Sequence, residues 1–200
     1  GAHAGQIDNM ADYQNMIASG TNALAEIKAG LVGPRPDLAV RAIGSMGSPD
    51  AVIDLLPLAA SQDGELRASV AWALGQCGGQ TAMTELAKLA DDPYPPAREA
   101  AIMALAHSPS TGDAAIQRAL ADPISSVRLA AVRAVARGGR KEQIPWLLPM
   151  LSWRAEMRPD PAGKGEDAKP VEVIVWAEPS LPIRLAVVQA LSALKAADSL

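Results

Sequence analysis

Phenylalanine is missing from this 200-residue chain, and the only aromatic side chains are four tryptophans and two tyrosines. Hydrophobic residues nevertheless make up 49% of the sequence, because alanine and the aliphatic residues are abundant. Alanine is the strongest helix former, and its small side chain lets helices approach closely. A single cysteine excludes an internal disulfide. The composition therefore favours a core of closely packed helices without covalent cross-links.

Long apolar runs and a basic excess are also missing. No stretch of eighteen apolar residues occurs, so the sequence predicts no membrane-spanning helix. With 18 basic against 22 acidic residues the net charge is −4, which argues against a general nucleic-acid binder. Residues 121–158, however, carry seven basic and three acidic side chains, and their positive patch contains Arg133, Arg137, Arg140 and Lys141. This patch is either a dock for an acidic peptide or anionic ligand, or a solvated face.

Known catalytic signatures are absent: the sequence has no glycine-rich phosphate loop, no nucleophile elbow and no paired-histidine metal motif. His3 lies at the N-terminus, which leaves His107 and Cys77 as soft ligands, and we expect neither a metal nor a cofactor. Cys77 and His107 end consecutive predicted helices, so a Cys–His nucleophile is one interpretation. We favour a buried structural thiol, because Cys77 takes the apolar position that Met46 fills one repeat earlier.

What the sequence does contain is an internal repeat. Residues 67–92 read as two helices with small and apolar residues at helical spacing, and similar stretches recur on both sides. Aligning these copies places four small residues in register, 31, 31 and 30 residues apart: Gly44, Gly75, Ala106 and Ala136. A fifth copy follows a longer gap, with Ser192 in the same register. Repeats of this period predict a solenoid of stacked helix pairs.

We expect a single domain over residues 1–200 with four parts. Residues 1–33 form an N-terminal helical cap, 34–152 the repeats, 153–176 a β-hairpin insertion and 177–200 the last inner helix. The hairpin prediction rests on two alternating stretches, WRAEM and the β-branched VEVIVW, separated by a loop rich in proline and glycine.

Acidic residues and arginines recur together at the start of the inner helices. The acids are Asp63, Asp92 and Asp122, and the arginines are Arg67, Arg98, Arg128 and Arg184. Stacked repeats would align them along the solenoid. They then form either a basic binding stripe or a structural ladder of Asp–Arg ion pairs between neighbouring repeats, and we favour the ladder.

The pattern D-P-x-x-x-V-R-x-x-A-x-x-A-L-G resembles HEAT-like repeats of the type seen in phycobilisome lyases and many bacterial scaffold proteins. Residues 122–138 and 63–78 match it best, and the likeness covers roughly 34–152 and 177–196. The first repeat departs from it, with Pro36 in place of the ladder arginine. The resemblance implies an all-α, right-handed α-α superhelix of about five helix pairs, with the β-hairpin inserted near the C-terminus.

The resemblance also implies that the second helix of each pair lines a concave groove. Placing the repeats of this sequence on that arrangement gives three rows of residues, called columns here, that run along the groove. The first contains Arg41, Trp72, Met103 and Arg133, the second Gln76, His107 and Arg137, and the third Glu99 and Leu129. Exposed tryptophan, methionine and arginine are typical of protein-binding hot spots. Alternatively, Trp72 packs on Arg41 through a cation–π contact. We favour a partner-binding groove made of Arg41, Trp72, Met103, His107, Arg133 and Arg137.

The predicted hairpin carries Trp153 and Trp176. Insertions in repeat arrays often hold the specific function, so these tryptophans either bind a partner or belong to a hairpin that folds back over the C-terminal end. A strand edge of the hairpin can also pair with its copy in a second chain, which would give a homodimer.

We therefore expect a non-catalytic scaffold that binds a segment of another protein in the groove. Acidic segments are among the expected partners. The hairpin would hold or close one end of the groove. Two alternatives stay open. One is a subunit of a chromophore or cofactor lyase, which requires an exposed Cys77 or His107. The other is a structural module of a larger protein. We expect no nucleic-acid partner.

The N-terminal sequence Gly1-Ala2-His3-Ala4-Gly5 bears on location. It fits either a sequence added in cloning or the remnant of a small-residue cleavage site. A cytoplasmic location is therefore favoured, and export to the periplasm or beyond stays open.

Overall fold

The computed structural model describes residues 9–19, 23–108, 111–158 and 170–196. The chain falls into two compact units, residues 1–138 and 139–200, and each is described by itself. The single domain predicted over 1–200, with its internal boundaries, stays a prediction.

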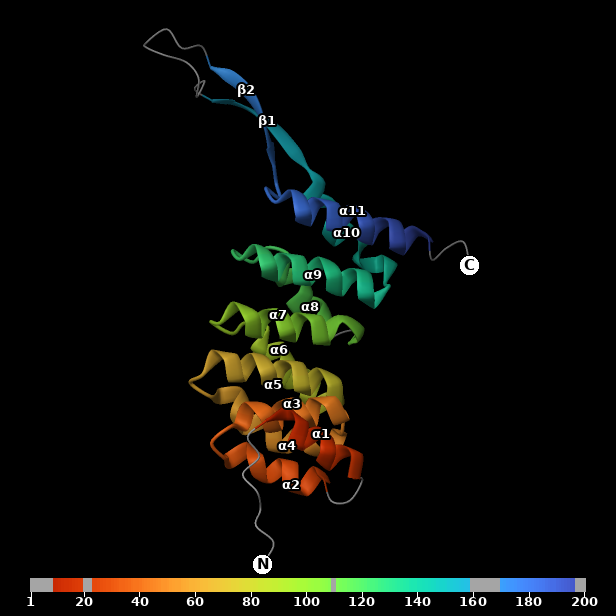
Figure 1. Ribbon diagram of the computed structural model, residues 1–200. Coiled ribbons are helices and arrows are strands. Elements are labelled where there is room, and N and C mark those ends of the chain that lie inside the picture. The colour runs from red at the N-terminus through yellow and green to blue at the C-terminus, as the bar shows by residue number, and fades with distance from the viewer. Residues whose placement is uncertain (1–8, 20–22, 109–110, 159–169, 197–200) are drawn as a thin grey trace, which may run out of the picture. The chain divides into compact units, whose positions relative to one another are not determined.

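Stacked inner helices form the spine of the first unit (Figure 1). They are α3 (Pro36–Met46), α5 (Gly64–Cys77), α7 (Pro95–Ala104) and α9 (Ser125–Gly138). Each inner helix packs on the next one along the chain. Before them, α1 (Met10–Ser19), α2 (Ala23–Ala29) and a 3₁₀ turn (Gly30–Val32) pack on α3, the position expected of an N-terminal cap.

The segments between the inner helices are less regular. They contain α4 (Val52–Leu55) between two 3₁₀ turns (Pro49–Ala51 and Leu56–Ala60), then α6 (Gln80–Leu89) and α8 (Thr111–Ala119). The helix α4 is therefore only four residues long. Pro57 is the cause, because it has no N–H to donate to a helical hydrogen bond. A 3₁₀ turn (Leu105–His107) likewise follows α7, so His107 lies in this turn and not in the helix.

Small residues allow the inner helices to approach closely. A Cβ added to Gly75 of α5 would lie 2.5 Å from the Cβ of Ala104 in α7. Around these contacts Ile43, Leu74 and Ile102 are completely buried. The small residues that recur in the sequence are thus where consecutive repeats meet.

Each inner helix has a side toward the preceding repeat and a side toward the following one. On α5, Gly64 and Gly75 lie toward the following repeat, where Tyr94 and Ala104 are their neighbours. Ala73 lies toward the preceding repeat, against Gly44 of α3. Between these two sides, Trp72 and Gln76 are exposed.

The second unit contains short helical segments, a hairpin and one long helix. Its elements are two 3₁₀ turns (Lys141–Gln143 and Leu148–Leu151), α10 (Ile144–Leu147), β1 (Trp153–Arg158), β2 (Val171–Trp176) and α11 (Leu181–Ala196). β1 and β2 pair antiparallel, with Trp153 opposite Trp176 and Ala155 opposite Ile174. The predicted helical repeat fold with a β-hairpin near the C-terminus is confirmed. The predicted hairpin loop lies almost entirely outside the described residues.

A search for membrane spans is negative for the described residues, in which every helix is too short or too polar to cross a bilayer.

Candidate functional site

An open cavity of about 790 Å³ lies over α5, α7, the turn that follows α7, and α9. Five of the six predicted groove residues line it: Trp72, Met103, His107, Arg133 and Arg137. The sixth, Arg41, lines a smaller cavity of about 320 Å³ together with Trp72. The structure thus brings the predicted groove residues together on the inner helices, and their role in binding stays a prediction.

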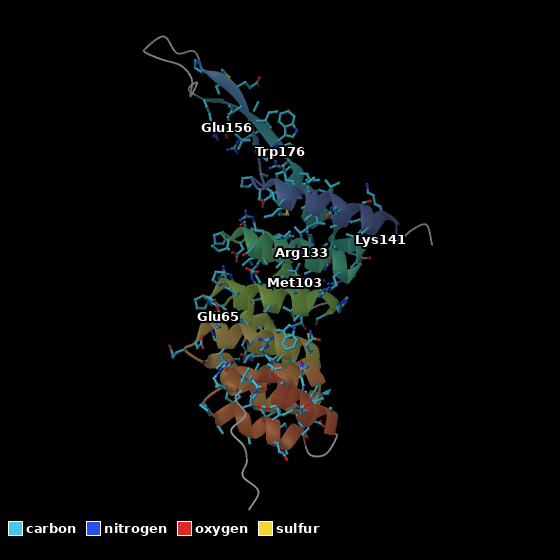
Figure 2. The ribbon with its side chains drawn as sticks, viewed as in Figure 1. Glu65, Met103, Arg133, Lys141, Glu156 and Trp176 are labelled. Carbon is cyan, nitrogen blue, oxygen red and sulfur yellow. The ribbon has the colours of Figure 1, made fainter. Side chains whose placement is uncertain are left out.

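The apolar part of the cavity consists mainly of Trp72 and Met103. The indole ring of Trp72 lies against α3, because a Cβ on Gly44 would come within 2.3 Å of a ring carbon. The residue Trp72 is nevertheless 40% exposed. Met103 of α7 is half-buried, and Figure 2 shows it one helix away from Arg133 of α9. Trp72 therefore contacts α3 at a glycine. The cation–π contact found among the described residues is a different one, between Arg184 and Trp176.

The arginines in the basic part of the cavity have no carboxylate partner among the described residues. Arg133 and Arg137 are four residues apart on α9, so both project from the same side of the helix, and both are exposed. In the part of the chain that the structure describes, their guanidinium groups and that of Arg41 make no ion pair or hydrogen bond. Several arginines outside the groove pair with carboxylates, as Arg118 does with Asp91 at 2.9 Å and Arg98 with Asp122 at 2.8 Å.

The carboxylates near the cavity lie at the opposite, N-terminal ends of the inner helices. Glu99 of α7 lines the cavity and accepts a hydrogen bond from the hydroxyl of Ser126 at the start of α9. Glu65 of α5 is similarly bonded to the hydroxyl of Tyr94, and this hydrogen bond raises the pKa of Tyr94. Among the residues that line the cavity, the acid Glu99 therefore lies near the N-terminal end of its helix, whereas Arg133 and Arg137 lie toward the C-terminal end of theirs.

The arginine ladder lies away from the cavity. Arg67 donates two hydrogen bonds of 2.7 Å to Asp92, and Arg98 binds Asp122 in the same way at 2.8 and 3.0 Å. Each arginine thus pairs with the acid of the following repeat. Arg128 and Arg184 donate to backbone carbonyls, those of Asp122 and Glu178 among them. Asp63, the first acid of the series, caps α5 by accepting from the N–H of Glu65.

These ion pairs are largely buried, and they change the pKa of the acids. The hydrogen bond from Arg67 is the main reason why the pKa of Asp92 is lowered, although burial opposes it. At Asp122 burial is the largest single effect and raises the pKa, but the hydrogen bonds from Arg98 and a backbone N–H, together with the charges of Arg98 and Arg128, lower the pKa overall. Both acids are therefore ionised near neutral pH, where their ion pairs connect neighbouring repeats.

Cys77 is 5% exposed, and its sulfur lies 4.0 Å from the carbonyl oxygen of Ile43. Burial raises the pKa of its thiol. His107 is exposed in the cavity, but Cys77 is not among the residues that line it. A buried thiol with a raised pKa is a poor nucleophile or ligand. Among the described residues, no group of three or more histidine, cysteine and acidic side chains is placed to hold a metal ion.

The hairpin exposes an apolar face of its own. Trp153 and Trp176 face each other across the strands and are 59% and 36% exposed, and Met157 and Ile174 on the same face are 66% and 61% exposed. The guanidinium of Arg184 lies 4.6 Å from the centroid of the Trp176 ring. Glu156 lies on the other face (Figure 2), where hydrogen bonds from Arg158 and Arg154 lower its pKa.

Sequence reasoning did not select all the cavity residues. Glu99, Gln76 and Leu129 line the cavity and stand in the predicted groove columns, but the predicted binding set did not include them. Ser126 was missed altogether, because a serine in the first turn of a helix is an ordinary N-terminal residue. Its position opposite Glu99 becomes evident only when the repeats are stacked.

Comparison with known proteins agrees with this architecture. Residues 37–106 match the family model described as HEAT repeats. No curated protein matches the chain. Among solved structures, a similar one is the designed armadillo repeat protein YIII(Dq.V1)4CPAF in complex with peptide (KR)4. The two chains are 16% identical, the match covers 94% of this chain and 87% of the other, and the TM-score is 0.58. At this identity the likeness shows a shared fold of stacked helical repeats.

Proposed function

We propose that this protein is a scaffold that binds a segment of another protein in the cavity over α5, α7 and α9. One observation carries the proposal: an exposed tryptophan and a methionine share an open cavity with two arginines that have no ion pair among the described residues. Trp and Arg are enriched among the energetic hot spots of protein interfaces, and Met is enriched in their composition. The contact of Trp72 with Gly44 holds the ring in place before a partner arrives, which lowers the entropic cost of binding.

We further propose that the bound segment is acidic. Arg133 and Arg137 carry uncompensated positive charge into the cavity, and Arg41 does so beside Trp72. A carboxylate that reaches two guanidinium groups accepts charge-assisted hydrogen bonds, which are about twice as strong as neutral ones. The similar armadillo repeat protein holds a peptide of lysine and arginine, whereas the uncompensated charges in this cavity favour a ligand of opposite sign.

The arrangement of the cavity suggests what the segment contains. Trp72 and Met103 offer a surface for one apolar side chain, and Arg133 and Arg137 offer a clamp for an acidic side chain nearby. Glu99 favours a neutral or basic group at the other end of the cavity. A short sequence that combines an apolar residue with acidic residues fits all three parts.

The hairpin is a second candidate contact surface. The exposure of Trp153 and Trp176 supports this role for another protein, and the open strand edges leave pairing with a second copy as a further proposal. The lyase-subunit alternative requires an exposed Cys77 or His107; Cys77 is buried, but His107 is exposed in the cavity, so this alternative stays open beside the binding without catalysis that we propose.

A peptide array tests the proposed function. Peptides of one length are sorted by net charge and apolar content, with (KR)4 as the charge-reversed probe. Three proteins are compared: the wild type, an Arg133→Glu, Arg137→Glu variant, and an Arg118→Glu variant whose substitution lies on α8, outside the cavity. Wild type and Arg118→Glu should retain acidic peptides that contain an apolar residue, and the double variant should lose them. Equal retention by all three proteins, or a preference of wild type for (KR)4, would contradict the proposal.

A further inference from the structure

A positive charge lies on the first and on the last inner helix of the first unit, α3 and α9. Arg41, Trp72, Met103 and Arg133 occupy equivalent positions on α3, α5, α7 and α9. Trp72 lines both the smaller cavity, which contains Arg41, and the larger one, so the two cavities share this side chain. Met103 and Arg133 continue the row across the larger cavity (Figure 2). The order across the inner helices is therefore basic, apolar, apolar, basic.

The charge of Arg41 is available to a ligand because the acid one turn away from it is already paired. Asp37 lies four residues before Arg41 on α3, a spacing that often gives an ion pair. The carboxylate oxygens of Asp37 instead accept hydrogen bonds of 2.9 and 2.8 Å from the guanidinium of Arg35. This hydrogen bonding is the main reason why the pKa of Asp37 is lowered. Arg41 itself is exposed, and its guanidinium makes no ion pair or hydrogen bond with any described residue.

We propose that the two cavities together take one extended segment that runs across the inner helices and carries an acidic residue on both sides of its apolar centre. This inference rests on the proposed function and adds to it the direction of the segment and a second acidic contact. The apolar centre packs on Trp72 and Met103. One acid pairs with Arg133 and Arg137, and the other pairs with Arg41. Each end of the segment thus meets a charge of opposite sign.

The stacking of the helices sets the distance between the two acids. Packed helices lie about 8–10 Å apart, and α3 and α9 are separated by three such steps, so the Cα atoms of Arg41 and Arg133 are roughly 24–30 Å apart. An extended chain advances about 3.3 Å per residue, which places the acids about seven to nine residues apart. A helical segment rises about 1.5 Å per residue and would need about sixteen to twenty residues. Because each ordered residue costs conformational entropy, the shorter extended segment is favoured.

The two acidic contacts differ in strength. Arg133 and Arg137 are one helical turn apart, so both can donate to one carboxylate, whereas Arg41 offers a single guanidinium. The contact at Arg41 is an exposed ion pair, which strengthens binding by about threefold to fivefold and weakens with added salt. The pair of arginines on α9 therefore holds the segment, and Arg41 selects segments that have a second acid at the right distance.

Fluorescence anisotropy with synthetic peptides tests the inference on the full chain. One-ended peptides have a leucine centre and glutamates at either the N-terminal or the C-terminal end, and a two-ended peptide has glutamates at both ends, about eight residues apart. The wild type should bind the two-ended peptide about threefold to fivefold more tightly than the better one-ended peptide. Arg41→Gln should remove this difference. The matched change Arg118→Gln, on α8 and outside both cavities, should keep it. Circular dichroism checks that both variants are folded.

Two results would overturn this inference and leave the proposed function standing. One is equal binding of one-ended and two-ended peptides by the wild type, and the other is an advantage of the two-ended peptide that persists in Arg41→Gln. In a series of two-ended peptides, tightest binding with acids about sixteen to twenty residues apart would also overturn it, because that spacing indicates a helical segment. The proposed function itself fails, and this inference with it, if the wild type binds every peptide as weakly as the Arg133→Glu, Arg137→Glu variant does.

Discussion

The indole ring of Trp72 lies on Gly44 of the preceding repeat, so closely that any side chain at residue 44 would collide with it. This contact fixes the ring against α3 and leaves 40% of the residue exposed to the cavities on either side. A large apolar side chain in a fixed position is what a binding site needs in order to avoid the cost of ordering it on association. The same contact makes the site sensitive to a change in α3.

Replacing Gly44 by alanine should displace the ring. The added Cβ would lie 2.3 Å from the Trp72 ring and 3.0 Å from the Cα of Ala73, so either the ring or the backbone of α5 must move. We expect a loss of about 1–3 kcal/mol in the free energy of unfolding, the usual cost of overpacking. Chemical denaturation measures it. A Gly44→Ala, Trp72→Ala variant should lose less than the two single changes together, and strict additivity would contradict the contact.

Asp92→Asn should destabilise the protein near neutral pH. Asp92 is 8% exposed and accepts two hydrogen bonds from Arg67, so the substitution leaves a nearly buried guanidinium without its counter-charge. We expect a loss of about 3 kcal/mol, the lower end for breaking a buried pair, because Arg67 retains its bond to the carbonyl of Ser61. The matched change Asp91→Asn removes an exposed pair with Arg118 and should cost less than about 1 kcal/mol. Equal losses in thermal unfolding would refute the distinction.

Lowering the pH should reduce the stability that the Asp–Arg ladder contributes. The pKa values of Asp92 and Asp122 are lowered in the folded protein, so the unfolded chain binds protons more readily. The stability that these acids contribute is complete above their unfolded pKa of about 4 and is lost as the pH falls through their lower folded values. Unfolding monitored between pH 6 and pH 2 should show this loss, and Asp92→Asn should have a shallower dependence. An unchanged slope would indicate that Asp92 does not contribute.

Cys77 should be unreactive in the native protein. It is 5% exposed, and burial raises the pKa of its thiol, so the reactive thiolate is scarce. A thiol-specific chromogenic reagent should therefore modify the native protein slowly and the denatured protein at once. The signal is simple to interpret, because the chain has a single cysteine. Rapid native modification would reopen the interpretation of Cys77 as a nucleophile.

Arg184→Gln should loosen the hairpin. The guanidinium of Arg184 stacks on the Trp176 ring and donates to the carbonyls of Glu178 and Pro179. Loss of the stacking costs about 1 kcal/mol, which corresponds to a roughly fivefold faster opening of the β1–β2 hydrogen bonds. Amide hydrogen exchange measures this. Arg158→Gln, at the far end of β1, is the control and should leave the amides beside Trp176 unchanged.

The helical repeats and the hairpin were predictable because their signals are local. The period that aligns Gly44 with Gly75 marks close helix contacts, and the alternation in VEVIVW marks a strand. The shortness of α4 is likewise a local effect, because Pro57 cannot donate a helical hydrogen bond. The 3₁₀ turn that holds His107 carries no comparable signal, because the sequence around it continues the helical pattern.

The state of the arginines was harder to predict. Arg67 and Arg133 are both on inner helices, yet Arg67 is paired with Asp92 and Arg133 projects into the cavity. The repeat register separated them into different columns, and this was enough to propose a ladder and a groove. The lack of a counter-charge for Arg133 and Arg137 among the described residues depends on which side chains the stacked repeats bring near, and no local pattern encodes that.

The most direct test of the binding cavity is an NMR titration that follows the indole N–H signals of the four tryptophans, each assigned by substitution with phenylalanine. The probe is the acidic, apolar-containing peptide that the wild type retains on the array. The account predicts that the Trp72 signal shifts with saturation, and that the Trp153 and Trp176 signals of the hairpin shift less. A titration in which the hairpin signals move and Trp72 does not would contradict the central claim.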